Sequence, residues 1–138
     1  ELIVVDLGAT YKGYVSDMTR TFSLMPTGKQ LRLLGVVKRA QEAAIKRIRD
    51  GVKAASVDRA ARGVIYRAGY GKFCSHGTGH GVGLEIHEAP SLAPRSEDIL
   101  RRRMVLTVEP GIYVPRIGGA RFEDVVLVTE ESCELLTG

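Results

Sequence analysis

The segment "LIVVDLGATYKGYVSDMTRTFSL" (residues 2–24) predicts a β-hairpin at the start of the chain. Its first arm, 2–7, is apolar apart from Asp6, and its second arm, 14–24, is rich in β-branched and aromatic residues. Each arm therefore carries one carboxylate, Asp6 or Asp17. Such residues need a reason, because an ionised carboxylate in an apolar setting is costly unless it is paired or binds a metal.

Two helices are predicted after this hairpin. Thr27 can cap a helix over residues 28–49 that Gly51 ends, and Ser56 can cap a second helix over residues 57–68. Gly69 and Gly71 would end the second helix. Apolar spacing predicts the buried positions Leu31, Leu34, Val37, Gln41, Ala44, Ile45 and Ile48 on the first helix and Ala60, Ala61, Val64, Ile65 and Ala68 on the second.

A second hairpin is predicted from residues 104–114 and 120–131, and "CELLT" then forms a short strand. This hairpin carries Glu109 and Glu123 and so repeats the acidic pattern of the first. Two helices precede the second hairpin, whereas the first begins the chain, which starts without Met inside a strand. We therefore expect a fragment whose first pair of helices lies upstream.

Composition narrows the classes of partner. The chain has 138 residues, of which 44% are hydrophobic and 26% charged, as in one soluble domain. Its net charge of +4 comes from helix-like segments without neighbouring aromatic residues, so a nucleic-acid partner is not expected. The longest apolar runs are too short for a membrane span. Two distant cysteines, Cys74 and Cys133, fit a reducing cytoplasm, with Cys74 also a candidate ligand.

Each of the four carboxylates also has a purely structural interpretation. Asp6 could belong to a turn and Glu109 could precede a Pro-Gly turn, while Asp17 could pair with Arg20 and Glu123 with Arg121. Taken together with the histidines, however, the four favour a metal site. Four carboxylates and one imidazole suit two divalent ions that share bridging ligands, and favour Mn, Fe or Co over a closed zinc site. Such a pair activates water and polarises a carbonyl, so we expect amide or ester hydrolysis.

All three histidines lie in "FCSHGTGHGVGLEIHEAP" (residues 73–90). The stretch could form a metal site, a turn-rich loop or a phosphate cradle, although it lacks the GK[ST] ending of a P-loop. His76 and His80 are spaced as in HExxH, but the glycines between them do not predict a helix. The residues alone leave open which histidine binds metal.

These motifs resemble the M24 metallopeptidase family. The similar stretches are "VDLGATYKGYVSDMTRTF", "HGTGHGVGLEIHEAP", "VLTVEPGIYVP" and "GGARFEDVVLVTE", and they cover nearly the whole chain. The resemblance implies an α+β pita-bread (creatinase/aminopeptidase-like) fold, a curved antiparallel sheet with helices on its outer face. It also implies one catalytic domain over residues 1–138 that is incomplete at its N-terminal side.

The resemblance implies a role for each site residue. Asp6 would chelate one metal ion, Asp17 and Glu123 would bridge both ions, and His80 and Glu109 would complete the other site. Glu109 would also shuttle protons. His87 and His76 would act in catalysis and contact the substrate, with His76 on the proline side of the pocket, and Arg121 would lie near the substrate carboxylate.

The contexts are more similar to those of Xaa-Pro dipeptidase (prolidase) and aminopeptidase P than to methionine aminopeptidase. The resemblance therefore implies hydrolysis of the bond before proline at a peptide N-terminus, with Mn or Co as the metal pair and Fe or Zn also acceptable. It further implies small peptide substrates and a homodimer of the full-length protein. The alternatives are a methionine aminopeptidase and a non-catalytic peptide-binding module on the same fold.

Overall fold

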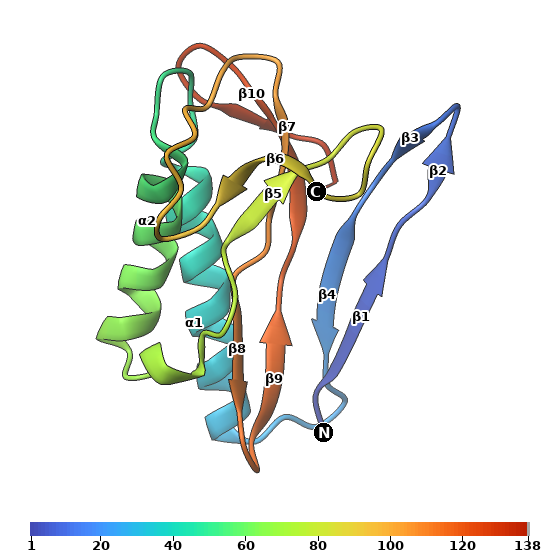
Figure 1. Cartoon of the computed structure of the whole chain (residues 1–138). Coiled ribbons are helices and arrows are strands. Elements are labelled where there is room, and N and C mark those ends of the chain that lie inside the picture. Colours follow the sequence, from blue (N-terminus) through green and yellow to red (C-terminus); the bar gives the residue numbers. More distant parts are fainter. Residues whose placement is uncertain (138) are drawn as a thin grey trace.

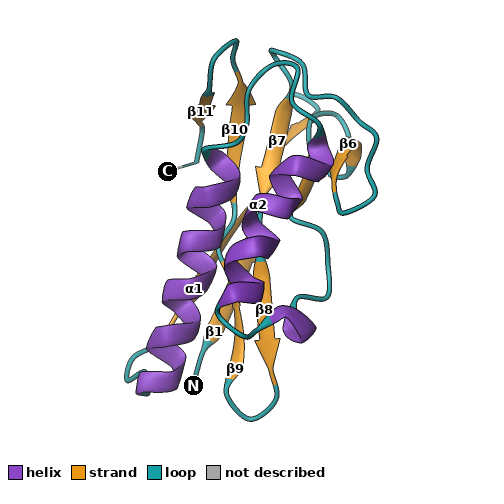
Figure 2. Ribbon diagram, turned by 90° about the vertical axis from the view of Figure 1, so that its left-hand side faces the viewer, coloured by secondary structure: helices purple, strands orange, loops and turns teal. Residues whose placement is uncertain are grey.

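The computed structural model describes residues 1–137 and has the predicted α+β architecture. Two helices lie side by side over one face of a layer of antiparallel strands (Figure 1, Figure 2). In Figure 1 the first hairpin, in blue, is the part farthest from the helices. Among the described residues, no helix is long and apolar enough to cross a membrane.

The secondary-structure elements are β1 (Ile3–Leu7), β2 (Thr10–Tyr11), β3 (Tyr14–Val15), β4 (Met18–Phe22), α1 (Gly28–Ile45), α2 (Ala54–Arg67), the short 3-10 helix η1 (Gly71–Phe73), β5 (Gly79–Gly81), β6 (Glu88–Leu92), β7 (Val105–Val108), β8 (Gly111–Val114), β9 (Gly118–Arg121), β10 (Asp124–Val128) and β11 (Cys133–Leu135).

The first hairpin is confirmed, but its second arm is interrupted. Strands β1 and β4 pair antiparallel, with Asp6 opposite Thr19. The short strands β2 and β3 pair beyond them, and Asp17 lies in the gap between β3 and β4. The chain is tightly folded here, because a Cβ at Gly8 would come within 2.3 Å of the Ser16 carbonyl oxygen. Asp17 is therefore displayed from an irregular segment and not from the continuous strand predicted over 14–24.

The second hairpin is also broken in the middle of both arms. Strand β8 pairs with β9 next to the turn, and β7 pairs with β10 farther along. Between these pairings lie Glu109 and Pro110 on one arm and Phe122 and Glu123 on the other. Proline has no amide hydrogen to donate to a strand partner, which accounts for the break on its side. Both acidic residues again fall where the regular pairing stops.

A five-stranded antiparallel sheet contains the rest of the β-structure, in the order β11-β10-β7-β5-β6. Strand β11 corresponds to the predicted "CELLT" strand. Strand β5, which carries His80, pairs with β6 and β7, so part of the glycine-histidine stretch is built into this sheet. His80 thus lies in the sheet, whereas His76 and His87 lie in the irregular segments on either side of β5.

Helix α1 begins as predicted and ends earlier. The Thr27 hydroxyl accepts a hydrogen bond from the Gln30 amide, and the Gln30 side chain accepts one from the Thr27 amide, which together form a capping box. The regular helix ends at Ile45, not at residue 49, and turns carry the chain to Gly51, whose φ is +77°. Gly51 thus supplies a left-handed residue that most side chains disfavour.

The predicted start of α2 is wrong by three residues. The helix starts at Ala54 with Lys53 as its N-cap, so Ser56 lies inside the first turn, where its hydroxyl donates to the Lys53 carbonyl. The helix ends at Arg67, one residue before the predicted end at residue 68, and Gly69 follows with a φ of +86°. The Ser56 hydroxyl bond to the Lys53 carbonyl shows a common alternative to helix capping, in which a serine hydroxyl binds the backbone of its own turn.

The core lies between the two helices and the strands. Helix α1 packs on β7, β8 and β9, and α2 packs on β6 and on α1. Leu31 does not belong to the buried face as predicted, because its side chain is 56% exposed, while Leu33 and Val36 are buried in its place. Burial of each large aliphatic side chain contributes about 1.5–3 kcal/mol. The largest fully buried apolar residues are Leu33, Ile48, Ile65, Leu92, Leu100, Leu106 and Ile112.

The first hairpin is fastened to the second mainly by polar contacts. Thr19 and Glu123 form a β-bridge, and Arg20 donates to the Glu123 carbonyl over 2.6 Å and to Asp124 Oδ1 over 2.7 Å. Asp124 is buried and also accepts from Gln41 of α1. We call the contacts of Thr19 and Arg20 with Glu123 and Asp124 the hairpin seam. The other side of this hairpin leaves apolar side chains such as Phe22 exposed.

Replacing Arg20 tests the hairpin seam. Arg20→Met should lower the free energy of unfolding by roughly 2–3 kcal/mol, because Asp124 loses its ionic partner in a buried setting. Denaturant unfolding measures this change. Arg32→Met, an exposed arginine of α1, is the matched control and should shift stability by less than about 0.5 kcal/mol. Equal shifts for the two variants would contradict the role given to Arg20.

Candidate metal centre

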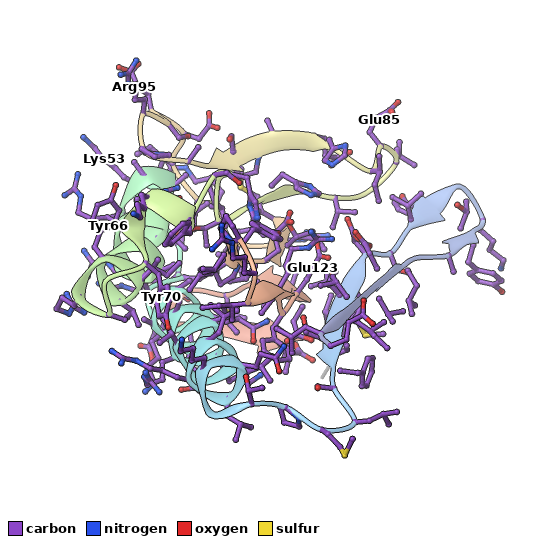
Figure 3. The ribbon with its side chains drawn as sticks, turned by 90° about the horizontal axis from the view of Figure 1, so that it is seen from below. Lys53, Tyr66, Tyr70, Glu85, Arg95 and Glu123 are labelled. Atoms are coloured by element: carbon purple, nitrogen blue, oxygen red, sulfur yellow. The ribbon has the colours of Figure 1, made fainter. Side chains whose placement is uncertain are left out.

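Both acidic hairpins and strand β5 meet at one place in the molecule. Asp6 lies in β1, Asp17 precedes β4, Glu109 follows β7, Glu123 precedes β10, and His80 lies in the middle of β5. Figure 3, seen from below, shows Glu123 in the interior of the molecule. Side chains from distant parts of the sequence therefore converge on a common centre.

Three of the predicted ligands form a compact group. One ligand atom each from Asp17, His80 and Glu123 lies within 4.8 Å of the other two. His80 Nε2 lies 3.8 Å from Asp17 Oδ2 and 3.0 Å from Glu109 Oε1, so Glu109 adjoins the group through His80. The donors are carboxylate oxygens and one imidazole nitrogen, a set that binds divalent cations such as Mn and Fe.

The backbone fixes the orientation of His80. Its Nδ1 lies 2.9 Å from the Gly81 carbonyl oxygen, which can only accept, so Nδ1 carries the proton and Nε2 faces the carboxylates. The strands approach too closely here for side chains on either neighbour. A Cβ at Gly79 would lie 2.0 Å from the Thr107 carbonyl oxygen, and one at Gly81 would lie 2.2 Å from the Ala89 carbonyl oxygen. These glycines allow the imidazole to be held at the sheet surface.

Glu123 is the most deeply buried carboxylate of the group, with 1% of its surface exposed. The Thr19 hydroxyl donates to its Oε2 over 2.6 Å. Burial raises the pKa of Glu123 to about 7, and the nearby charges of Glu109, Asp17 and Asp6 act in the same direction. Burial and the charges of Asp6 and Glu109 likewise raise the pKa of Asp17. The charges crowd one another, and a bound cation would relieve this repulsion.

Glu109 differs from these two carboxylates because it is paired. Burial favours its neutral form, but the hydrogen bond and charge of His80 outweigh that effect and hold the pKa of Glu109 below its usual value. The Thr107 hydroxyl donates to Glu109 over 3.2 Å and accepts from the His80 amide over 3.0 Å. Thr107 thus fixes the relative positions of both side chains.

Asp6 stands apart from the compact group. Its side chain is 52% exposed, and its carboxylate accepts a hydrogen bond from Arg121 Nη2. The structural pairings considered for Asp17 and Glu123 are not found, because Arg20 binds Asp124 and Arg121 binds Asp6. Arg121 Nε also lies 4.0 Å from Glu109 Oε2. Arg121 therefore offsets negative charge at the edge of the group.

Tyr113 was not predicted as a site residue, yet it connects two predicted site residues. Its hydroxyl lies 2.8 Å from His76 Nε2 and 3.1 Å from Arg121 Nη1. His76 Nδ1 lies 2.7 Å from the Gly77 carbonyl oxygen and must carry a proton, so a neutral His76 accepts from the tyrosine. Tyr113 then accepts from Arg121. In the sequence, Tyr113 was only one residue of the strand predicted over 104–114.

The third histidine lies on the solvent side of the centre. His87 is exposed, and its ring centroid lies 4.4 Å from that of His80 at a tilted angle. The structure thus brings His87 next to the metal-ligand candidates, while His76 approaches them through Tyr113. Cys74 is not within this group, since its sulfur contacts Arg62.

The residues present fit a divalent cation. Asp17, His80 and Glu123 offer converging donors, Glu109 is in contact with His80, and the elevated pKa of Glu123 is the result expected for a carboxylate site without a counter-ion. Asp6 could join them once its carboxylate is shared with Arg121.

Comparison with known proteins agrees with this geometry. The model of the metallopeptidase family M24 matches residues 1–130. A curated relative from Pyrococcus horikoshii, Xaa-Pro dipeptidase, is 45% identical over 138 residues, which are 99% of this chain and 39% of the relative. The chain thus spans about two fifths of the length of the curated relatives it matches.

Solved structures show the same similarity. The prolidase from Pyrococcus furiosus has a TM-score of 0.97 at 46% identity, over 99% of this chain and 41% of that one. The X-Pro aminopeptidase from Thermotoga maritima has a TM-score of 0.96 at 42% identity, over 99% of this chain and 39% of that one. These matches confirm the pita-bread fold expected from the sequence.

The burial of Glu123 predicts how the stability of the metal-free protein depends on pH. With a pKa of about 7 in the folded state and 4.5 as its model value, Glu123 lowers stability as pH rises from about 4.5 to 7 and has a constant effect above that range. The Glu123→Gln variant lacks this loss. In chelator, its stability relative to the parent should therefore rise by roughly 3 kcal/mol between pH 4 and pH 8.

Thermal or denaturant unfolding at several pH values measures this difference. The same series with saturating Mn²⁺ is the control, since a cation that neutralises the carboxylates should remove the advantage of Glu123→Gln at pH 8. A difference between parent and variant that is independent of pH in chelator would contradict the prediction.

Proposed function

The chain belongs to metallopeptidase family M24, and from this membership and the geometry above we propose that the protein hydrolyses the peptide bond preceding proline at a peptide N-terminus. The observation that carries the proposal is the convergence of Asp17, His80 and Glu123, with Glu109 in contact with His80. Residues 1–138 would form part of the catalytic domain of a longer protein.

We propose two divalent metal ions at this centre, with Mn or Co as the metal and Fe or Zn also accepted. Asp6 would chelate one ion, Asp17 and Glu123 would bridge both, and His80 and Glu109 would complete the second site. Bound there, the metal pair would supply activated water and Lewis-acid polarisation of the scissile carbonyl. The crowding of four carboxylates around one imidazole supports two ions better than one.

Residues around the metals would transfer protons, contact the substrate and stabilise charge during the reaction. Glu109 is half-buried and accepts a hydrogen bond from the Thr107 hydroxyl, a setting that suits a proton shuttle. His87 is exposed beside His80 and would contact the substrate and stabilise charge that develops on the carbonyl oxygen. His76 would line the proline side of the pocket, with Arg121 near the substrate carboxylate.

The names of the relatives support proline specificity and leave substrate length undecided. The Pyrococcus horikoshii relative is a Xaa-Pro dipeptidase, whereas the Thermotoga maritima structure is an X-Pro aminopeptidase. Both are similar to this chain to nearly the same degree. Small peptides with proline at the second position are therefore the proposed substrates. We also propose a homodimer of the full-length protein. A cytoplasmic location is proposed as well, because both cysteines are free, as is usual in a reducing compartment.

Substrate turnover tests the proposal directly. Addition of Mn²⁺ or Co²⁺ to the metal-free full-length protein should produce cleavage of a Xaa-Pro dipeptide, of a longer Xaa-Pro peptide, or of both, measured by release of the first residue. Faster cleavage of Met-Ala-Ser would instead identify a methionine aminopeptidase. Peptide binding without cleavage of any of these substrates, with metal bound, would identify a non-catalytic module.

Two substitutions should separate metal binding from substrate contact. Asp17→Asn should lose bound metal and most activity, because it removes one proposed bridging ligand. His87→Ala should keep its metal but lose activity by roughly a hundredfold, because its proposed contact is with the substrate. Elemental analysis together with kcat for each variant makes the measurement. Loss of both metals from His87→Ala would show that His80 is not the only histidine ligand.

A further inference from the structure

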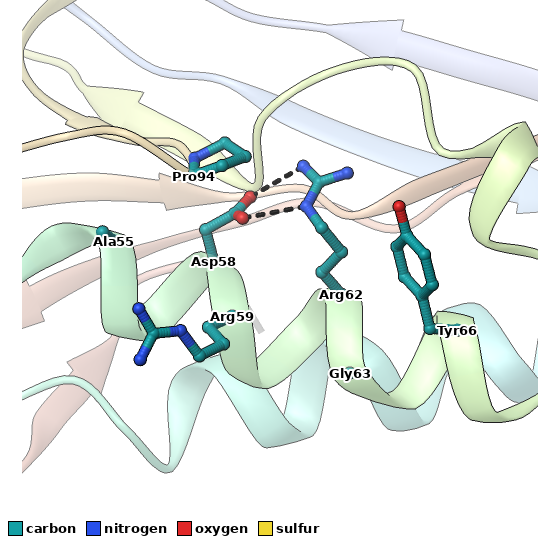
Figure 4. Close-up of a pocket in the computed structure, with 7 residues that line it drawn as sticks. All are labelled: Ala55, Asp58, Arg59, Arg62, Gly63, Tyr66 and Pro94. Carbon is teal, nitrogen blue, oxygen red and sulfur yellow. Dashed lines mark hydrogen bonds and ion pairs between the residues drawn. The ribbon is translucent and has the colours of Figure 1, made fainter.

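Helix α2 carries a buried ion pair on the side that faces the glycine-histidine stretch. Arg62 donates to Asp58 through two parallel hydrogen bonds, Nε to Oδ2 over 2.9 Å and Nη2 to Oδ1 over 3.0 Å (Figure 4). The Asp58 side chain is 1% exposed and the Arg62 side chain 19%. This two-point geometry holds the guanidinium plane in one orientation.

The remaining donors and acceptors of this pair all go to one short segment. Arg62 Nη2 donates to the His76 carbonyl over 2.9 Å, and Arg62 Nη1 donates to the Cys74 carbonyl over 3.3 Å. Asp58 Oδ1 accepts from the Thr78 hydroxyl over 2.9 Å. Three alternate residues, with His76 in the middle, are thus tied to the same ion pair.

The segment is also bound at its two ends, where the Cys74 amide donates to the Gly71 carbonyl and the Thr78 amide donates to the Leu92 carbonyl. No helix or strand is assigned over residues 74–78, which connect η1 to β5. The ring of His76 is held at its far end by Tyr113. Between the two bound ends, the His76 carbonyl accepts from Arg62, and this contact bears on where the backbone that carries the ring lies.

Stability alone is a weak explanation for such a pair. The desolvation of two charges largely cancels their attraction, so replacement of a buried pair by apolar residues of similar size is often neutral or stabilising. An interaction that contributes little to stability but fixes one segment is suited to positioning. Displacement of a substrate-facing group by about 1 Å can lower a rate by about a hundredfold.

We infer that Asp58 and Arg62 are positioning residues that hold His76 in its place in the substrate pocket from the opposite side of the sheet layer. The inference rests on the proposed function, because it uses the assignment of His76 to that pocket. Neither Asp58 nor Arg62 contacts the candidate metal ligands in the hydrogen bonds described, so their effect would pass through the backbone of residues 74–78.

The surroundings of the pair provide a matched control. A cavity of about 300 Å³ opens beside it, lined by Ala55, Asp58, Arg59, Arg62, Gly63, Tyr66 and Pro94 (Figure 4). Arg59 lies on the same helix and borders the same cavity, but Figure 4 shows its side chain directed away from the pair. A substitution at Arg59 therefore alters the cavity and the charge of α2 without touching the 74–78 segment.

The test removes both charges together, so that neither is left buried without a partner. The variant Asp58→Leu/Arg62→Met should remain folded and keep its metal, although the Thr78 hydroxyl loses its acceptor, but should lower kcat/KM for the Xaa-Pro substrate at least tenfold. The same double change made in a His76→Ala background should produce no further loss. The double variant should also change kcat and KM in the same proportion as His76→Ala does, but by smaller factors. Arg59→Gln should leave kcat/KM within twofold.

Two additional measurements cover the other outcomes. If the charge-free variant does not fold, Arg62→Lys keeps the ion pair but lacks the planar fork and should show an intermediate loss. Hydrogen exchange of residues 74–78 should be faster in either variant, whichever substrate the enzyme cleaves. Absence of Xaa-Pro cleavage by the parent protein would overturn the proposed function only. Unchanged exchange and unchanged kcat/KM, or equal losses with and without His76, would overturn this inference.

Discussion

The hairpin seam is the contact on which the centre depends. Asp6 and Asp17 belong to the first hairpin and Glu109 and Glu123 to the second, so the four carboxylates meet only if the two hairpins are joined. The Thr19 bridge to Glu123 and the hydrogen bonds of Arg20 to Glu123 and Asp124 make much of that junction, and Thr21 adds two hydrogen bonds with the Arg121 backbone. Gln41 extends it into the core by binding Asp124 from α1. The position of the candidate ligands is thus set by buried polar contacts as much as by apolar packing.

The same region shows that the centre is costly to build without a cation. Glu123 is nearly inaccessible and is raised to a pKa of about 7, while Asp17 is raised by burial and by its acidic neighbours. A core designed only for stability would not gather these groups. Arg121 offsets part of the charge at Asp6, and His80 offsets part at Glu109. Asp17 has only the more distant His80, whose Nε2 lies 3.8 Å from its Oδ2, and no ion pair to Glu123 is found among the described residues.

Sequence patterns predicted the elements well and the side-chain partners poorly. Both hairpins, both helices and the helix cap at Thr27 follow from local signals that act over a few residues. The breaks in the strands at Asp17 and Glu123 were not predicted, since alternation continues through them. The pairings of Arg20 with Asp17 and of Arg121 with Glu123, which the sequence left as alternatives to a metal site, are not found, because each arginine binds an acid about a hundred residues away. Tyr113 and the Asp58–Arg62 pair are likewise products of tertiary contact, and no short-range pattern reveals them.

The spread of the candidate ligands along the chain has a topological consequence. A cation held jointly by Asp17, His80 and Glu123 would cross-link three segments that are widely separated in sequence. Because these ligands come together only in the folded chain, the cation would bind that state and stabilise it, unlike a disulfide, which also constrains the unfolded chain. The metal would then form a reversible cross-link between the two hairpins, whose seam is largely polar. Resistance of the protein to proteolysis and the metal supply of its surroundings would thereby become linked properties.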